Sequence, residues 1–175
     1  MVKISLFGLP GTGTSKVGKL YAKIYSLDFV SSGNMFRDIA RGRGLSVYEL
    51  TEICSNNSKI DRELDNKIKL FGINNDNFII DSRLAWFTIS DSIKIKFVTD
   101  DIIRFKRISQ RDNISLDEVE IKTKNREASE RKRYFSYYNI EDYSEDKNFD
   151  YIIDTTNLTP EEICDKIKEY INNFY

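Results

Sequence analysis

The sequence predicts an α/β fold in which a parallel five-stranded sheet carries helices on both faces. Two observations lead to this expectation. Strand-length apolar runs alternate with amphipathic stretches along the chain, and a glycine-rich turn at residues 8–15 joins the first run to the first amphipathic stretch. Strands that alternate with helices form parallel sheets whose two faces are covered by the crossover helices. The 175 residues suit a single domain, which we place at 1–175.

In the first half of the chain, strand and helix signals follow one another closely. Apolar residues recur at helical spacing after the glycine-rich turn, and Ser32 is a suitable N-cap for the next helix. Ser46 followed by Glu49 matches the capping box, in which each side chain bonds the other residue's backbone N–H. The expected elements are a strand at 2–7, a helix at 15–26, a strand at 29–30, a helix from 32 through 39, and helices at 46–55 and 61–71.

The second half continues the alternation. Isoleucine and phenylalanine alternate with lysine after position 92, which is typical of a strand. Ser115 with Glu118 forms a second capping box, and Thr159 before Pro160 is a strong helix start. The expected elements are strands at 78–81, 93–99 and 151–153, a helix capped by Asp100 or Asp101 that ends near 112, a charged helix from 115 to about 138, and a last helix after 159.

Composition excludes several classes of function. The net charge of −1 argues against general coating of nucleic acid, and no stretch is long and apolar enough to span a membrane. The absence of histidine excludes histidine bases and Ser-His-Asp triads. Cys54 and Cys164 lack a C-x-x-C partner, so zinc is disfavoured and a disulfide is possible but unsupported. We expect a cytoplasmic protein, because the N-terminus lacks the layout of a signal peptide. We also expect it to be a monomer.

The strongest functional signal is the glycine-rich turn. It matches the phosphate-binding P-loop pattern G-x-x-x-x-G-K-[ST] at every position but one, since Thr14 stands in place of the lysine. Such a loop curls successive backbone N–H groups around one phosphate, and the serine hydroxyl is the expected Mg²⁺ ligand. The fold is therefore expected to be of the P-loop NTPase type, with a nucleotide bound by Gly8, Leu9, Pro10, Gly11, Thr12, Gly13, Thr14, Ser15 and Lys16.

The missing lysine requires another source of positive charge. Lys16 lies about 200° around the helix from position 14, so its side chain points elsewhere and its backbone N–H is the expected contact. Arginines supplied by later helices are the alternative. Arg104, Arg107 and Arg111 share one helix face, and Arg126 and Arg133 lie on the next helix. A solvated charged face is the competing interpretation of both runs.

A second anion site is expected at the carboxyl ends of the strands, where ligands bind in such sheets. Arg37 and Arg83 follow two strand ends and can hold an anion with their guanidinium forks. Asp81 ends an apolar run, as a ligand of hydrated Mg²⁺ does. Trp86 and the tyrosines near 134–138 are interpreted as packing residues rather than base-stacking ones.

Together these segments resemble the nucleoside monophosphate kinases, and more closely the archaeal-type (d)CMP kinases. The resemblance covers nearly the whole chain, and several members of that family also carry threonine in place of the loop lysine. One departure is Ser82, where many members have glycine. The matching segments are GLPGTGTS at 8–15, SSGNMFRDIAR at 31–41, IDRELD at 60–65, DSRLAW at 81–86, RISQR at 107–111, REASERKRY at 126–134 and FDYIIDTT at 149–156.

The resemblance implies transfer of phosphate from ATP to CMP or dCMP with Mg²⁺, an acceptor-binding flap at about 33–72 and a lid at about 112–133. It implies that Arg37 and Arg83 bind the acceptor phosphate and that Arg107 packs over adenine. Asp61 and Arg62 fall in the flap, where they are candidates for reading the cytosine edge. The residues with implied catalytic roles are Arg111, Arg126 and Arg133, together with Asp81.

Two other functions stay open at this point. One is a monophosphate kinase for a different base, AMP or UMP, because fold-level resemblance does not fix a base. The other is a nucleotide-binding protein without transfer activity, disabled at Thr14. A protein that binds RNA or DNA is poorly supported by the net charge.

Overall fold

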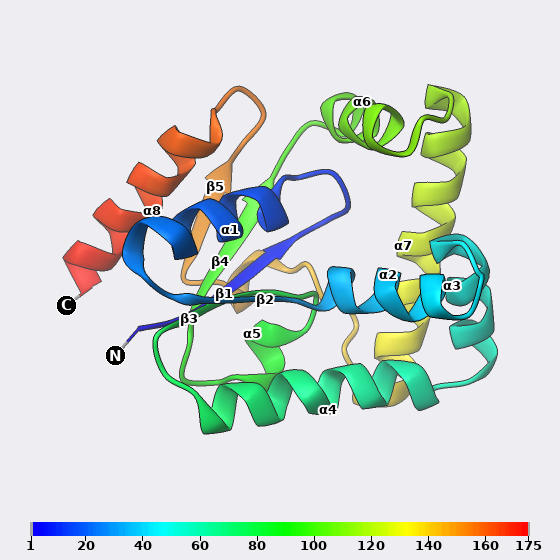
Figure 1. The fold of residues 1–175 in the computed structure, drawn as a ribbon, viewed down its shortest axis with the longest axis horizontal. Helices are drawn as coiled ribbons and strands as arrows, with labels where there is room; N and C mark the ends of the chain where they lie inside the picture. Colours follow the sequence, from blue (N-terminus) through cyan, green and yellow to red (C-terminus); the bar gives the residue numbers. More distant parts are fainter. Residues whose placement is uncertain (1, 175) are drawn as a thin grey trace.

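The computed structural model describes residues 2–174, excluding the side chains of 55, 56 and 174. At its centre lies a parallel five-stranded sheet in the order β2-β3-β1-β4-β5, which confirms the predicted fold class (Figure 1). The register sets Leu6 of the central strand beside Asp81, so that the glycine-rich turn and the end of β3 meet at one edge. The strands are β1 (Lys3–Gly8), β2 (Asp28–Ser31), β3 (Phe78–Asp81), β4 (Ile93–Val98) and β5 (Tyr151–Asp154).

The helices follow the predicted order with small shifts at their ends. The Ser46–Glu49 capping box is present, and Thr159 caps the last helix by accepting from the N–H of Glu162 at 3.2 Å. The expected N-cap Ser32 is wrong: Ser31 takes this role, because its side chain accepts from the N–H of Asn34. The helices are α1 (Thr14–Tyr25), α2 (Ser32–Gly42), α3 (Val47–Asn56), α4 (Lys59–Asn74), α5 (Ala85–Thr88), α6 (Asp101–Asp112), α7 (Leu116–Tyr138), the 3₁₀ helix η1 (Asp146–Asn148) and α8 (Pro160–Phe174).

The two faces of the sheet bury different cores, because successive strand residues point to opposite sides. On one face, Ile4 and Leu6 pack with α1 and α8, and Ile95 and Phe97 join the same cluster. On the other face, Phe7 packs against α7 and the segment after it, and a further cluster joins β3 to α4 and α5. Figure 1 shows α1 and α8 lying together over one side of the sheet, with α4 and α5 on the other.

The segment expected as the flap has a small core of its own. Phe36 and Ala40 of α2 pack there with Leu50 of α3 and Leu64 of α4. Cys54 is buried in this core and Cys164 in the core beneath α8, and both are free thiols. Across residues 2–174, no helix combines the length and apolar character that a membrane span requires.

Candidate active site

The glycine-rich turn has a backbone that only glycine adopts readily. Gly11 and Gly13 have φ values of 89° and 96°, in the left-handed region. A Cβ on Gly11 would also lie 2.6 Å from the backbone oxygen of Arg104, so α6 packs directly on the turn. The hydroxyl of Thr12 donates to the carbonyl oxygen of Leu9 at 2.9 Å, which closes the turn on itself.

Guanidinium groups from two other parts of the chain hold the carbonyl oxygens of the turn. Arg83 donates to the oxygen of Gly8, and Arg104 donates to the oxygen of Pro10 at 2.9 Å. Arg107 makes longer contacts with the oxygens of Gly11 and Thr12, at 3.4 and 3.5 Å. The positive charge that Thr14 cannot supply is therefore present around the turn, on side chains that come from the end of β3 and from α6.

Ser15 and Asp81 form an oxygen-rich pair beside the turn. The Ser15 hydroxyl donates to the Asp81 carboxylate, and the Ser31 hydroxyl donates to the same carboxylate oxygen at 3.2 Å. Hydroxyl and carboxylate oxygens are ligands that Mg²⁺ prefers, usually together with several waters. The chemistry of the two residues fits a Mg²⁺ site.

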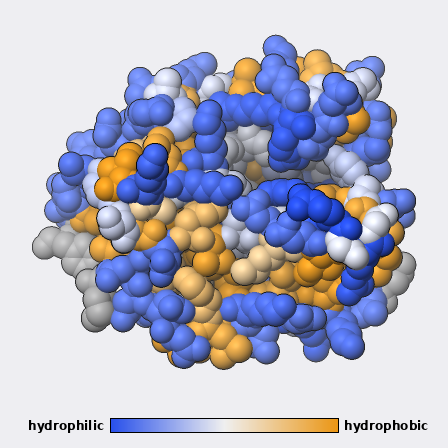
Figure 2. Space-filling model, in the orientation of Figure 1, coloured by the Kyte–Doolittle hydropathy of each residue, from blue (hydrophilic) through white to orange (hydrophobic). Residues whose placement is uncertain are grey.

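Six arginines line a cavity of about 450 Å³ that starts at the turn. They are Arg37, Arg83, Arg107, Arg111, Arg126 and Arg133. Figure 2 shows this hollow in the surface between α2 and the α6–α7 pair, with hydrophilic residues around its rim. Burial, and then the like charges of Arg111 and Arg126, lower the pKa of Arg37. Basic side chains outnumber acidic ones around this cavity, and such an excess of positive charge in a partly dry site favours the binding of an anion.

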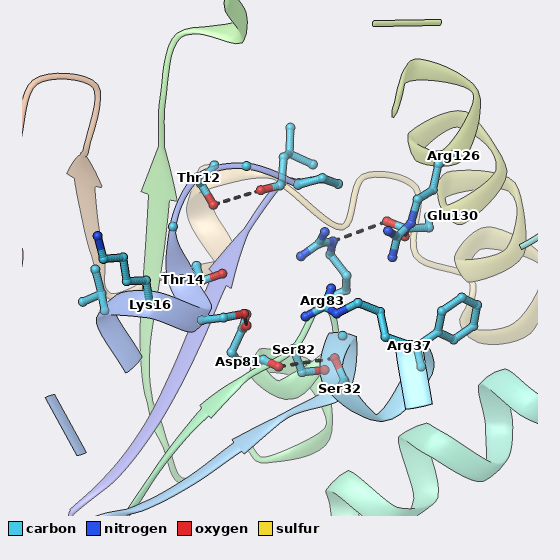
Figure 3. Close-up of a pocket in the computed structure, with 18 of the residues that line it drawn as sticks. Thr12, Thr14, Lys16, Ser32, Arg37, Asp81, Ser82, Arg83, Arg126 and Glu130 are labelled. Atoms are coloured by element: carbon cyan, nitrogen blue, oxygen red, sulfur yellow. Dashed lines mark hydrogen bonds and ion pairs between the residues drawn. The ribbon is translucent and has the colours of Figure 1, made fainter. Parts of the chain in front are cut away.

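Glu130 holds two of these arginines in place. Its carboxylate lies 3.3 Å from Nε of Arg83 and 2.9 Å from Nε of Arg126, and the residue is only 3% exposed. Burial raises the pKa of Glu130, but the surrounding arginines outweigh this, so the pKa is lowered overall. In Figure 3, Arg37 and Arg83 point toward one another, with Arg126 and Glu130 beside them, while Lys16 extends away from this group.

The α4 side of the cavity contains acids and apolar residues. Asp61 Oδ2 and Arg133 Nε lie 2.7 Å apart, and both residues are buried. Asp65, one helical turn after Asp61, accepts a hydrogen bond from the Tyr138 hydroxyl at 2.7 Å. Phe36 and Leu64 line the cavity next to these polar groups. This end differs from the arginine end because it combines apolar surface with hydrogen-bond acceptors.

The structure brings most of the residues that the sequence predicted to this one cavity. The turn at 9–16 lines it, as do Asp61, Asp81 and the six arginines named above. Arg133 lies against Asp61 rather than in contact with the turn. Arg62 does not line the cavity: it is exposed, and its guanidinium carbon lies 5.5 Å from the centre of the Tyr137 ring.

The sequence indicated Arg104 only as one of three arginines on a helix face that could supply charge, and it gave no site role to Glu130 or Asp65. Asp65 follows Asp61 by four residues, and that spacing alone signals a shared helix face. Glu130 has the same spacing from Arg126. Trp86 packs against aromatic rings, as expected, whereas Tyr134 both packs and lines the cavity.

Residues 3–157 match the model of the cytidylate kinase-like family. The chain belongs to this family. Curated relatives agree over nearly the full length: the cytidylate kinase of Staphylothermus marinus is 38% identical, over 99% of this chain and 98% of the relative. The cytidylate kinase of Methanosarcina mazei is 37% identical, over 98% and 97%. The predicted resemblance is thus confirmed at the level of the family.

Solved structures share the fold at low identity. An uncharacterized protein from Eubacterium ventriosum superposes with a TM-score of 0.72 at 17% identity, covering 98% of this chain and 99% of that one. Shikimate kinase from Acinetobacter baumannii, in complex with shikimate, gives a TM-score of 0.64 at 15% identity, covering 99% and 94%. These likenesses confirm the architecture that the family member adopts.

Proposed function

We propose that this protein is a cytidylate kinase, which transfers the γ-phosphoryl group of ATP to CMP or dCMP and releases ADP. The observation that carries the proposal is the cavity in which a phosphate-binding turn, an Mg²⁺-type oxygen pair and six arginines converge. Family membership and the names of the full-length relatives support this reaction. The nucleotides are expected to bind across the cavity, with their phosphates meeting among the arginines.

In this reaction the bond between the γ-phosphorus and the ADP oxygen breaks as an oxygen of the acceptor phosphate bonds to the same phosphorus. The acceptor phosphate is largely ionised at neutral pH, since its second pKa is about 6. No protein base is needed to activate it, which suits a chain without histidine. Catalysis then depends on alignment of the two phosphates and on neutralisation of their charge.

The residues of this chain supply both the alignment of the phosphates and the neutralisation of their charge. Backbone N–H groups of the turn hold the ATP phosphates, and Arg107 packs near the nucleotide at the α6 side. Arg37 and Arg83 hold the acceptor phosphate. Arg111 and Arg126 stabilise the charge that spreads over the transferring group. Mg²⁺, held through Ser15 and Asp81, would neutralise the phosphate oxygens when bound.

Closure of the site is part of the proposal. The flap at 33–72 has its own core, and the lid at 112–133 includes most of α7. We expect both to move toward the bound nucleotides. Closure excludes water, which otherwise competes with the acceptor for the γ-phosphoryl group.

The experiment is a coupled assay of ADP release with CMP, dCMP, UMP and AMP as acceptors. We expect the highest kcat/KM with CMP or dCMP. Highest turnover on AMP or UMP would replace the cytidylate assignment with another base. ATP binding without turnover on any acceptor would show a nucleotide-binding protein without transfer activity.

A further inference from the structure

The α4 side of the cavity is suited to a flat ring with polar edges. Phe36 and Leu64 are 7% and 6% exposed, and they line the cavity together with Tyr134. Apolar side chains of this kind sandwich a heteroaromatic base, while nearby polar groups read its edge. The carboxylates of Asp61 and Asp65 lie on the same side, one helical turn apart on α4.

Asp61 and Arg133 present an acceptor and a donor side by side. Their Oδ2 and Nε atoms are 2.7 Å apart, yet neither atom makes an aligned hydrogen bond with any residue in the described part of the chain. Both residues are more than nine-tenths buried. Buried charges persist in proteins when they are paired, so this ion pair fixes a carboxylate and a guanidinium at the cavity wall, which both residues line.

Asp65 differs from Asp61 in having no cation of its own. Its hydrogen-bond partner is the neutral Tyr138 hydroxyl, and within residues 2–174 it forms no ion pair. Its pKa is raised overall to about 6: burial, the largest cause, and the charge of Asp61 raise it, whereas the Tyr138 hydrogen bond and the charge of Arg133 lower it. A carboxylate in this position gains most from a ligand group that donates a hydrogen bond.

We propose that Asp65, beside the Asp61–Arg133 pair, accepts a hydrogen bond from the exocyclic amino group of the acceptor base and thereby distinguishes cytosine from uracil. The inference rests on the proposed function and names its specificity residue. Cytosine carries an amino donor at position 4, where uracil carries a keto acceptor. An ionised carboxylate attracts the amino group and repels the keto oxygen, so one residue contributes both to selection and to rejection.

The same chemistry makes the base preference depend on pH. Below its pKa, Asp65 is neutral and can donate to a keto oxygen, so discrimination against uracil falls. The titratable and charged groups that face Asp65 are Asp61 on its own helix and Arg133, Tyr134 and Tyr138 on α7. Of these, Asp65 has its pKa within the range from pH 5 to 8; burial raises the pKa of Asp61 above its ordinary value, and the pKa values of Tyr134, Tyr138 and Arg133 are raised away from neutrality.

The test is the ratio of kcat/KM for CMP to that for UMP, measured from pH 5 to 8. The ratio cancels the ionisation of the acceptor phosphate, which both substrates share. For the unmodified protein we expect the ratio to rise by about tenfold or more through pH 6. In Asp65→Asn the amide can donate to uracil, so the ratio should fall by about 10- to 100-fold at pH 7.5 and lose its pH dependence.

Two further variants sharpen the test. Tyr138→Phe removes the hydrogen bond that lowers the pKa of Asp65, so the midpoint of the ratio should move to higher pH. Asp38→Asn, at an exposed ion pair on α2, is the matched control and should leave the ratio unchanged. If Asp65→Asn retains ATP binding and shows the same CMP-to-UMP ratio of kcat/KM as the unmodified protein, the role of Asp65 is overturned while the proposed function stands. Absence of turnover with every acceptor in the unmodified protein would instead overturn the proposed function.

Discussion

Glu130 is the residue whose removal should most disturb the site, and Glu130→Gln is the cleanest perturbation. The side chain keeps its size and one acceptor oxygen but loses the charge that pairs with Arg83 and Arg126. Those two guanidinium groups would then face each other without a carboxylate between them. We expect a less stable protein that binds anions more strongly.

The magnitude follows from burial. Loss of one partner from a fully buried ion pair costs about 3–5 kcal/mol, because it leaves an unpaired charge. Here the side chains of Arg83 and Arg126 are 17% and 19% exposed and line an open cavity, so water relieves part of this cost. We expect a loss of about 2–3 kcal/mol in the free energy of unfolding. For a chain of this size that lowers Tm by about 4–12 °C.

The assay is thermal unfolding in low-salt buffer at pH 7, with and without phosphate. Phosphate should raise the Tm of Glu130→Gln more than that of the unmodified protein, because it occupies the freed arginines. The pKa of Glu130 is lowered, so its stabilisation is present above its ordinary value of 4.5 and is lost as the pH falls through the lowered value. The difference between the two proteins should therefore shrink below about pH 4.

Glu120→Gln is the matched control on the same helix. Its partner Lys124 is 57% exposed, and such surface pairs contribute less than about 1 kcal/mol. If Glu130→Gln and Glu120→Gln unfold at the same temperature, the account of Glu130 as the organiser of the arginines is refuted.

Four further predictions follow from the site. Arg126→Ala should lower kcat by about 100-fold or more through lost charge stabilisation, whereas Lys16→Ala, whose side chain points away, should change it less than about threefold in the ADP-release assay. Arg133→Ala should raise the KM for CMP more than it lowers kcat, since it strands the buried Asp61; an equal kcat loss with every acceptor would place Arg133 at the phosphates instead. Gly11→Ala should lower the free energy of unfolding by about 1–3 kcal/mol and weaken ATP binding, because the φ of Gly11 is 89° and the added Cβ would meet the Arg104 backbone. Gly42→Ala, in open space on α2, is the control and should not destabilise the protein in thermal unfolding. Asp65→Asn should stabilise the protein at pH 7 by about 1–3 kcal/mol, because a pKa raised from 3.8 to about 6 makes the ionised carboxylate unfavourable in the folded protein above pH 6. The gain should disappear near pH 4 in unfolding measurements. An equal gain at pH 4 and pH 7 would contradict the raised pKa.

The parts of the fold that local chemistry determines were predictable from the sequence. The capping box at Ser46 and the cap at Thr159 satisfy N–H groups a few residues away, so they were identified without knowledge of the tertiary structure. Strand β3 was predicted with its observed bounds, because an apolar run followed by Asp81 has no competing interpretation. The Mg²⁺-type pair followed from its two sequence positions and from the rule that parallel strands end at one edge.

Features that depend on distant partners were not predictable. Ser31 and Ser32 are equally suitable N-caps by residue type. In the structure Ser31 is the N-cap of α2, and both hydroxyls donate hydrogen bonds to Asp81 of the neighbouring strand, which the local sequence does not show. Arg104 looked like one more cation on a charged face. Its burial against Pro10 and Glu127 depends on contacts with residues 94 positions earlier and 23 positions later. The assignment of a base-reading role to Asp65 likewise needed the position of Tyr138 on α7.

The arginine contacts to the glycine-rich turn also have a consequence for folding. A conventional lysine would lie within the turn itself, so the turn and its charge would form together. Here Arg83 and Arg104 reach the turn across 75 and 94 residues of chain, and contacts of such separation form late because a long loop must first be closed. The turn is therefore expected to acquire its phosphate affinity only when the segment after β3 and helix α6 have docked. During synthesis and refolding, a partly folded chain would then not bind ATP, so it would not hydrolyse ATP in an incomplete site.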